Sequence, residues 1–494
     1  MFQSIVEAVF HYADATPNKL CLADDEGCVT YAEYAEKIRK YAGCFSEIGF
    51  HSGDKIVVEA CQSIDYLAIE LALHLLGAVF VPVEHNCAAD KIASFIQRTK
   101  AKAVIVCKEA DYDDCECYSY LRLVQMCDTA LPYQPEFFPT KEAVSEILFS
   151  TGTTGREKGI VLCHANDIAL AENVMYGVEM EKDNVEQIPS PMNHSHGLRR
   201  YYANMYNGSS VILLGSVMDI MRFFSNIEKY SVTSIDLVPT ALTVILKLSK
   251  NKLSEYQEQL RYIQLGAAPL MEHDKEKICA LLPKTRLYNF YGSTESGCTC
   301  IYNFNRPDSK SNCIGKPTHN TSLLIVDDNR EPLRSSANHT GLLATKGSIN
   351  MLEYWDDPTE TQQVLSNGIV YSNDIGYLDA DGEVILLGRK GDVINVGGNK
   401  VSPEEIENAA KEMPVIVDCG CIPVADTAKG YVPKLFVQIA DGEAFNPIAI
   451  RTFLASKLEP YKIPQYIEQI EKLPRSYNGK LLRKELRECS RNHS

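Results

Sequence analysis

The sequence lacks an excess of basic residues. Among its 494 residues, 65 are acidic and 49 are basic, so the formal net charge is −16 at pH 7. Sequence-independent binding to nucleic acid or to an anionic membrane surface requires clustered lysine and arginine side chains. We therefore expect neither nucleic acid nor a membrane surface as a partner. A local basic pocket for a phosphorylated ligand is compatible with this composition.

The sequence also lacks the pattern of an export signal and of a membrane-spanning run. The N-terminal stretch MFQSIVEAVFHYADATP has no basic segment before its apolar residues, which recur at helical spacing. This pattern predicts an amphipathic helix rather than a signal peptide. Glu70 and His74 interrupt the most apolar stretch, residues 66–83, which predicts a buried helix running into a strand. We expect a cytoplasmic protein without membrane insertion.

Metal-binding cysteine spacing is missing as well. The chain has 17 cysteines, and some form Cys-x-Cys pairs, namely Cys115 with Cys117, Cys298 with Cys300 and Cys419 with Cys421. Structural zinc sites use Cys-x₂₋₄-Cys pairs with matching partners elsewhere in the chain. Reduced, mostly buried thiols are therefore expected rather than a metal–thiolate centre.

Apolar, strand-like runs alternate with helical periods along most of the chain. This alternation is typical of α/β sheets, and no repeat of about 20–50 residues indicates a solenoid. The expected strands lie at residues 55–60, 78–83, 101–107, 209–215 and 234–239.

The pattern changes near residue 388. The run DADGEVILLGRKGD predicts a hairpin, with a turn at Asp381 and Gly382. Farther along, Ser402 and Pro403 have the positions of an N-cap and a first helical residue. We expect a large N-terminal domain of βα-type sheets over residues 1–388 and a small α+β domain over residues 389–494.

The stretch LFSTGTTGREKG, residues 148–159, combines small hydroxyl side chains with three glycines. A surface turn explains it, because Gly, Ser and Thr are turn formers. A phosphate-binding loop explains it equally, because N–H groups and hydroxyls can converge on an anion, and Lys158 adds positive charge. The stretch lacks Walker A spacing, and the chain lacks the Gly-x-Gly-x-x-Gly fingerprint of dinucleotide sites. By itself the stretch leaves both interpretations open.

Four further motifs follow this stretch in order. They are YNFYGSTESG from residue 288, YSNDIGYLDADG from 371, GRKGDVINVGGNKVSPEEIE from 388 and LPRSYNGKLLRKEL from 473. Together the five motifs resemble the adenylate-forming superfamily, which includes acyl-CoA synthetases, peptide-synthetase adenylation domains and firefly-type luciferases. The resemblance covers essentially the whole chain and is strongest to acyl- and aryl-CoA ligases. It implies that the small C-terminal domain is mobile.

The resemblance implies an ATP site. The loop from Ser150 to Lys158 would hold the β- and γ-phosphates, while Tyr291 would stack on adenine and Asn289 would hydrogen-bond its edge. Asp374 would accept hydrogen bonds from the ribose hydroxyls, with Arg389 nearby. The full set implied for ATP or AMP is Ser150, Thr151, Gly152, Thr153, Thr154, Gly155, Lys158, Gly266, Ala267, Ala268, Asn289, Phe290, Tyr291, Gly292, Ser293, Thr294, Asp374 and Arg389.

The resemblance also implies catalytic, metal-binding and hinge roles. Lys480 would reach the carboxylate and the α-phosphate during adenylation, and Thr294 would contact the α-phosphate. Glu295 would hold Mg²⁺, with Thr151 as a second ligand. Gly391 takes the place of the domain hinge, where Asp or Lys is usual, and glycine tolerates large changes in φ and ψ. Rotation about it would bring Gly397 and Gly398 to the site, where they would leave room for a pantetheine arm.

The run PMNHSHGL, residues 191–198, matches the mouth of the family's acyl pocket. His194 has the position of the family's pocket His or aromatic residue and is assigned to the catalytic set. Ser195 follows where α-amino-acid-activating domains have Asp, and an unpaired buried ammonium group is unfavourable, so an amino acid substrate is disfavoured. Arg199 and Tyr202 are also assigned to the pocket. Arg199 and its neighbour Arg200 either are ordinary surface arginines or pair with a second substrate carboxylate or a phosphate of the thiol acceptor.

The sequence thus predicts an ATP-dependent acid–thiol ligase that uses ATP, Mg²⁺ and coenzyme A. A non-amino carboxylic acid, small or aromatic, would be converted first to an acyl-adenylate and then to a thioester. An alternative acceptor is the phosphopantetheine of an acyl carrier protein. A nucleotide-binding pseudoenzyme with a scaffold role would show decay of the catalytic residues, and here they are present.

Overall fold

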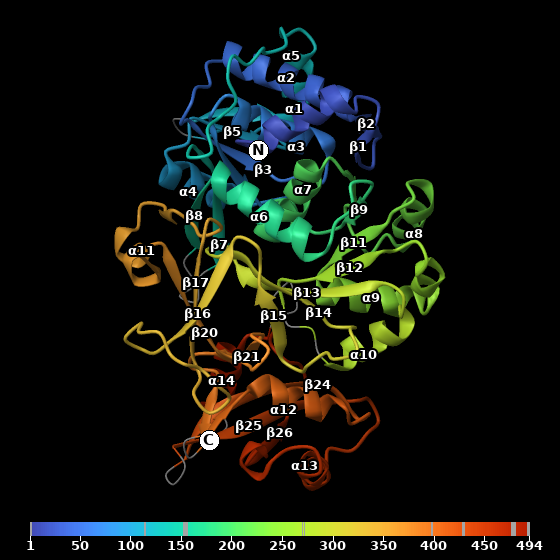
Figure 1. Ribbon diagram of the computed structural model, residues 1–494, viewed down its shortest axis with the longest axis vertical. Coiled ribbons are helices and arrows are strands. Elements are labelled where there is room, and N and C mark those ends of the chain that lie inside the picture. The colour runs from blue at the N-terminus through green and yellow to red at the C-terminus, as the bar shows by residue number, and fades with distance from the viewer. Residues whose placement is uncertain are drawn as a thin grey trace.

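The computed structural model describes residues 2–112, 115–151, 157–268, 270, 272–396, 399–426, 430–475 and 481–491. Within them the strands form three sheets of fourteen, seven and five strands, here named the large, second and small sheets (Figure 1). The small sheet lies at the bottom of Figure 1, below the two others. The predicted α/β class, with a large N-terminal part and a small C-terminal α+β part, is confirmed.

The second sheet is built mainly from the first third of the chain. Its central strands run parallel, and β8 and β18 add an antiparallel edge. In spatial order it contains β18 (Glu353–Tyr354), β8 (Glu157–Cys163), β7 (Val144–Thr151), β4 (Val79–Val83), β3 (Lys55–Glu59), β5 (Ala103–Val106) and β6 (Glu116–Ser119).

The large sheet has a parallel half, from β1 to β13, and an antiparallel half, from β14 onward. Its order is β16 (Thr321–Val326), β17 (Gly341–Gly347), β20 (Ile369–Leu378), β21 (Val384–Arg389), β15 (Cys313–Pro317), β14 (Gly297–Asn303), β13 (Arg286–Ser293), β12 (Tyr262–Leu265), β11 (Ser234–Leu237), β9 (Val185–Ile188), β10 (Ser210–Leu213), β1 (Leu20–Ala23) and β2 (Cys28–Thr30), with β19 (Leu365–Ser366) beside β20. All five strands expected from the sequence are confirmed in these two sheets.

The small sheet follows the predicted hairpin, which β20 and β21 form. Its strands are β23 (Asn399–Val401), β22 (Ile394–Val396), β25 (Gly430–Ile439), β24 (Ile416–Asp426) and β26 (Tyr466–Gln469). Around it lie α12 (Pro403–Lys411), α13 (Pro447–Ala455), α14 (Arg483–Arg491) and the 3₁₀ turn η2 (Pro460–Lys462). Ser402 is the N-cap residue of α12, as predicted.

Helices cover the two larger sheets. They are α1 (Ile5–Ala15), α2 (Tyr31–Glu47), α3 (Ile64–Leu75), α4 (Ala89–Thr99), α5 (Tyr120–Cys127), α6 (His164–Gly177), α7 (Ser195–Asn207), α8 (Ile220–Lys229), α9 (Pro239–Ser249), α10 (Glu272–Leu281) and α11 (Pro358–Val364), with the 3₁₀ turn η1 (Lys252–Tyr256). The amphipathic N-terminal helix is confirmed as α1, capped by the Ser4 hydroxyl.

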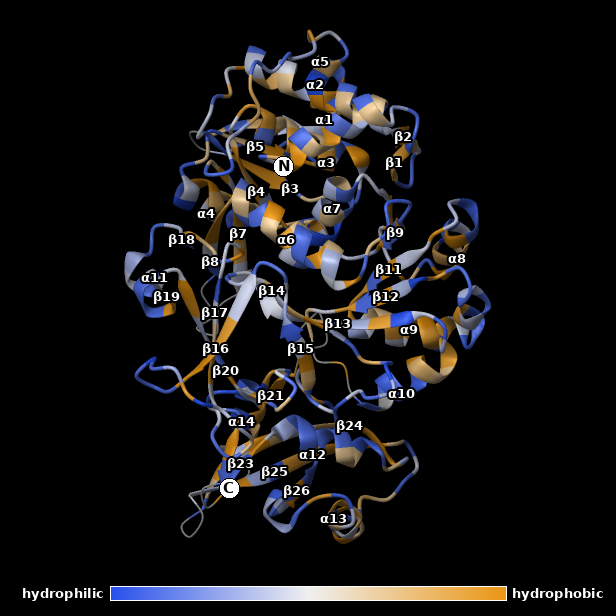
Figure 2. Ribbon diagram, viewed as in Figure 1, coloured by the Kyte–Doolittle hydropathy of each residue, from blue (hydrophilic) through white to orange (hydrophobic). Residues whose placement is uncertain are grey.

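The apolar stretch over residues 66–83 is the buried helix and strand that the sequence predicts. Every residue of α3 except Asp65 is buried, and so is all of β4. Figure 2 shows the strands of this region in the colours of hydrophobic residues, and the outer helices carry mixed colours. Among the described residues, no helix combines the length and the hydropathy that crossing a membrane requires.

Helix α2 packs so closely on a loop that one glycine is required in its interior. A Cβ at Gly43 would lie 1.9 Å from the carbonyl oxygen of Leu131. Alanine is the better helix former by about 1 kcal/mol, but overpacking of this kind destabilises by about 1–3 kcal/mol.

We predict that Gly43→Ala lowers the thermal denaturation midpoint. Gly27→Ala, where a Cβ meets no described atom within 4 Å, is the control and should leave it unchanged. An unchanged midpoint for Gly43→Ala would contradict this packing.

Candidate active site

The predicted phosphate loop joins two antiparallel strands. Ser150 and Lys158 are register partners in β7 and β8, so the loop is the connection of a hairpin. Gly152, Thr153, Thr154 and Gly155 lie outside the described residues, as does the side chain of Thr151. Lys158 forms an ion pair with Glu360 of α11. Its ammonium nitrogen also lies 5.0 Å from the centre of the Tyr354 ring.

Tyr354 connects this lysine to the predicted metal ligand. Its hydroxyl donates a hydrogen bond of 2.8 Å to Oε1 of Glu295. Burial raises the pKa of Tyr354, and Glu295 adds to the shift, so the hydroxyl stays a donor. Thr294, half-buried, directly precedes Glu295 in the chain. Tyr354 and Glu360 were missed from the sequence, where the run EYWDDPTE carries no recognisable signal.

The predicted ribose site is assembled by the hairpin of β20 and β21. Asp374 and Arg389 are register partners, and Arg389 Nε lies 3.5 Å from Asp374 Oδ1. The hydroxyl of Tyr291, on β13, donates a hydrogen bond of 2.5 Å to Asp374 Oδ2. The tyrosine assigned to adenine and the carboxylate assigned to ribose are therefore fixed to each other.

The residues of the predicted purine slot include a buried, unpaired acceptor and a closely packed glycine. Asn289 Oδ1 is buried and has no hydrogen-bond partner among the described residues. Asn289 is the register partner of Leu265, which directly precedes Gly266. A Cβ at Gly266 would lie 2.7 Å from the His196 ring and 3.1 Å from Phe290. Ala267, next in the chain, has a positive φ of 66°. Buried acceptors are rarely left unpaired, so Asn289 Oδ1 has the capacity to accept a hydrogen bond from a bound donor.

The motif segment after Tyr291 turns sharply. A Cβ at Gly292 would lie 1.7 Å from the carbonyl oxygen of Gly297, so only glycine fits there. The hydroxyl of Ser293 accepts a hydrogen bond of 3.1 Å from the Ser296 amide. This turn positions Thr294 and Glu295 at the end of β13.

Ala268, which follows Ala267 in the predicted purine slot, is half-buried.

The histidines of the run PMNHSHGL lie at the start of α7. His194 is the N-cap residue, and its side chain reaches solvent. Desolvation by the surrounding protein lowers the pKa of its imidazole. Ser195 is half-buried and begins the helix. His196 Nε2 lies 2.9 Å from Oδ1 of the fully buried Asp236, whose Oδ2 accepts a 2.5 Å hydrogen bond from a serine hydroxyl. His196 contacts the slot wall through Gly266, so it is a site residue that was not selected from the sequence.

Of the two alternatives for Arg199, the surface residue is wrong. Arg199 is buried and contacts Glu146 at 2.5 Å and Asp167 at 2.9 Å. The hydroxyl of Tyr202 hydrogen-bonds to both Glu70 and Glu146. Burial raises the pKa of Asp167 to about 8, with Glu146 adding to the shift and Arg199 opposing it. Arg199 and Tyr202 are thus committed to internal carboxylates, which does not support their assignment to the acyl pocket.

Arg200 is buried as well, so the surface alternative fails there too. It contacts Glu186 of β9 through Nε at 2.9 Å and through Nη2 at 2.8 Å. Glu186 also accepts a hydrogen bond of 2.6 Å from Asn204. The guanidinium carbon of Arg200 lies 5.4 Å from the ring centre of Phe290. Arg200 therefore packs against Phe290 of β13 and is paired with Glu186, so its charge is not available to a ligand.

The predicted C-terminal residues are only partly described. Lys480, Gly397 and Gly398 lie outside the described residues. Gly391 has a φ of 91°, and a Cβ there would meet no described atom within 4 Å. Its carbonyl accepts a hydrogen bond of 2.6 Å from Arg487 of α14.

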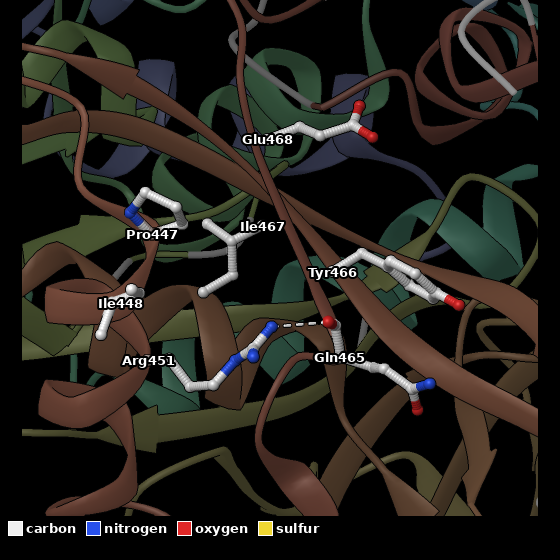
Figure 3. Close-up of a pocket in the computed structure, with 7 residues that line it drawn as sticks. All are labelled: Pro447, Ile448, Arg451, Gln465, Tyr466, Ile467 and Glu468. Carbon is white, nitrogen blue, oxygen red and sulfur yellow. Dashed lines mark hydrogen bonds between the residues drawn. The ribbon is translucent and has the colours of Figure 1, made fainter.

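A shallow pocket in the small C-terminal part is separate from these residues (Figure 3). Arg451 of α13 and the strand β26 line it, and Arg451 donates a hydrogen bond of 2.6 Å to the Gln465 carbonyl. None of the residues assigned from the sequence to ATP, metal or acid lines this pocket. It is a surface hollow apart from the candidate active site.

The pair of Arg200 with Glu186 generates a stability prediction. Removing one partner leaves a buried charge uncompensated, which destabilises by about 3–5 kcal/mol, whereas replacing both with apolar residues is often neutral. We predict that Arg200→Met strongly lowers the urea midpoint of unfolding and that Arg200→Met combined with Glu186→Met recovers most of the loss. A double variant as unstable as the single one would contradict this account.

Comparisons with known proteins agree with this geometry. The sequence profile of the AMP-binding enzyme family matches residues 9–355, and that of the AMP-binding enzyme C-terminal domain matches residues 405–480. A 2-succinylbenzoate–CoA ligase of Bacillus cereus is 28% identical over 480 residues, which are 96% of each chain. A 4-coumarate–CoA ligase of Vanilla planifolia is 26% identical, with 93% of this chain and 88% of that protein covered.

Solved structures share the whole fold. The ATP-bound crystal structure of MatB from Rhodopseudomonas palustris superposes with a TM-score of 0.88 at 23% identity, and 99% of each chain is covered. The o-succinylbenzoate CoA synthetase of Bacillus subtilis, in complex with its acyl-adenylate intermediate, gives a TM-score of 0.83 at 22% identity over 97% of each chain. The two family profiles together span both parts of the molecule, so the chain belongs to the AMP-binding enzyme family.

Proposed function

We propose that the protein is an ATP-dependent carboxylic acid–CoA ligase that works through an acyl-adenylate. The observation that carries the proposal is the buried, unpaired Oδ1 of Asn289 beside the linked group of Tyr291, Asp374 and Arg389. An adenine amino group is the donor that Asn289 lacks, and ribose hydroxyls are donors for the Asp374 carboxylate. An adenosine unit would therefore offer donors to both Asn289 and Asp374.

In the first step, a substrate carboxylate would attack the α-phosphorus of ATP and pyrophosphate would leave. Both reactants are anions, so the protein must neutralise charge and align the attack. Lys158 and Lys480 would supply positive charge at the two sides of the triphosphate, and Thr294 would hydrogen-bond the α-phosphate. Lys158 would have to leave Glu360 or share it, because the two are paired in this structure.

Glu295 fits Mg²⁺ in its chemistry. It offers carboxylate oxygens, which Mg²⁺ prefers, and the Tyr354 hydroxyl orients one of them. Bound with ATP, Mg²⁺ would neutralise phosphate charge. Thr151 remains a proposed second ligand.

The second step would transfer the acyl group to a thiol. Coenzyme A is the proposed acceptor because the relatives are named as CoA ligases. An acyl carrier protein remains the alternative. The proposal divides the chain at residues 388 and 389 and assigns the rotation of the small domain to Gly391, with Gly397 and Gly398 in the thiol channel. A cytoplasmic location also belongs to this proposal, because the 17 cysteines favour a reducing compartment.

The proposed acid is small or aromatic and lacks an α-amino group. The relatives are named for 2-succinylbenzoate and 4-coumarate, and a structural neighbour is an anthranilate CoA ligase. His194 and Ser195 remain in the proposed pocket mouth, and we add His196. A second substrate carboxylate would need a partner other than Arg199 or Arg200, because both are already paired.

The reaction is tested by pyrophosphate release from ATP and Mg²⁺ across short, dicarboxylic, aromatic, amino and fatty acids, with and without coenzyme A. We expect turnover with one non-amino class that rises with coenzyme A. Lys480→Ala should reduce adenylation at least about a hundredfold, because it removes a charge at the reacting centre. Lys484→Ala, an exposed neighbour on α14, should not. Adenylation without a CoA thioester would favour a carrier protein, and no turnover with any acid would contradict the ligase proposal.

Recognition of adenine is tested separately by calorimetry with AMP and IMP, since IMP lacks the amino donor. The protein should prefer AMP. Asn289→Ala should weaken AMP binding about tenfold and remove the preference, because one hydrogen bond contributes roughly 0.5–1.5 kcal/mol. Asn329→Ala, in an exposed turn, is the matched control. Retained discrimination in Asn289→Ala would show that another group reads the base.

A further inference from the structure

Three side chains with metal-ligating atoms follow three neighbouring parallel strands. Strands β4, β3 and β5 are adjacent in the second sheet, and Cys61, His85 and Cys107 lie just beyond their carboxyl ends. Because parallel strands end at the same edge of a sheet, these residues come together although they are far apart in the chain. One thiol or imidazole atom from each lies within 4.8 Å of the others.

The distances in this cluster suit a tetrahedral cation. Cys61 Sγ lies 3.2 Å from Cys107 Sγ, and Cys107 Sγ lies 3.9 Å from His85 Nδ1. Zinc bonds of about 2.0–2.3 Å place tetrahedral ligand atoms roughly 3.3–3.8 Å apart. Small movements of two side chains are therefore enough to give zinc-binding geometry. The His85 side chain is 59% exposed, which gives a cation a path from solvent.

A buried carboxylate organises the same place. The Glu59 side chain is only 8% exposed, and its Oε1 lies 3.6 Å from His85 Nδ1. Its two oxygens accept hydrogen bonds from the backbone amides of Asn86, at 2.9 Å, and Cys107, at 2.8 Å. Glu59 thus fixes the two chain segments that carry His85 and Cys107 and adds negative charge beside them.

We propose that Cys61, Cys107 and His85 form a binding site for a soft divalent cation of the zinc class. Two thiolates and a neutral imidazole are the donor set that zinc favours over Mg²⁺. Binding displaces the thiol protons to solvent and forms two metal–sulfur bonds and one metal–nitrogen bond. The fourth position is open to water, as in zinc sites with three protein ligands.

The site would stabilise one wall of the acyl region. Gln62, next to Cys61, donates hydrogen bonds to the carbonyls of Ile188 and Ser190, at 3.2 Å and 2.9 Å. These carbonyls belong to the segment that leads to His194. A cation that holds Cys61 in place therefore also restrains the segment before the pocket histidine. This role is independent of which acid or acceptor the enzyme uses.

The test is cobalt titration of the whole protein, treated with chelator and kept in a non-thiol reductant. We expect one equivalent of Co²⁺ with thiolate-to-cobalt charge-transfer bands and the visible bands of tetrahedral cobalt, and we expect zinc to displace it. Cys61→Ser and Cys107→Ser should abolish the charge-transfer bands. Glu59→Gln should weaken binding severalfold, because it removes the negative charge beside the three ligands. Cys87→Ser, two residues from His85, is the matched control and should keep the bands.

Thiol alkylation followed by peptide mass analysis gives a readout that needs no variant. Zinc should protect Cys61 and Cys107 from alkylation and leave Cys87 reactive. The proposal is overturned if the wild-type protein gives no cobalt–thiolate bands, or if they persist in Cys61→Ser. A Cys61–Cys107 disulfide that forms in air, with no metal binding after it is reduced again, would identify the pair as a redox couple instead.

Discussion

Buried guanidinium–carboxylate pairs on one helix connect the two larger sheets. Arg199 of α7 pairs with Glu146 on β7 of the second sheet, and Arg200 pairs with Glu186 on β9 of the large sheet. Neither carboxylate is accessible to water, so each charge requires its partner. The loop after β7 is the predicted phosphate loop, and Arg200 also contacts Phe290 of the adenine motif. The relative position of the two halves of the proposed nucleotide site therefore depends on this helix.

Local patterns predicted much of the fold. The strand runs, the hairpin of β20 and β21, and the helix that begins after Ser402 follow from periodicity and turn residues that act over a few neighbours. The burial of Arg199 and Arg200 could not be predicted in this way. An arginine is a surface residue unless a carboxylate from another element meets it, and Glu146 and Glu186 lie on strands 53 and 14 residues before their arginines. The sequence shows charges but does not show their pairing.

In the candidate site, too, residues within local motifs could be predicted, and residues brought together by the fold could not. Asn289, Tyr291 and Asp374 were selected because they belong to ordered motifs, and the structure brings Tyr291 and Asp374 into contact. Tyr354 has no motif, and only the fold shows that it contacts Glu295. Likewise, Cys61, His85 and Cys107 have no metal-site spacing, because topology rather than sequence distance brings strand ends together. Cysteine spacing detects sites built on one hairpin, and it misses sites built across a parallel sheet.

The residue before Lys158 adds a negative charge at the end of the proposed phosphate loop. Glu157 is the first residue of β8, and its carboxylate would lie near phosphates bound there. Lys91 lies 2.9 Å from Glu157 and 2.7 Å from Glu84, so it neutralises this charge and links the loop to the end of β4. His85 is the next residue after Glu84. A lysine on α4 therefore balances the Glu157 carboxylate, and the same ion pairs join the end of the proposed phosphate loop to the segment that carries His85.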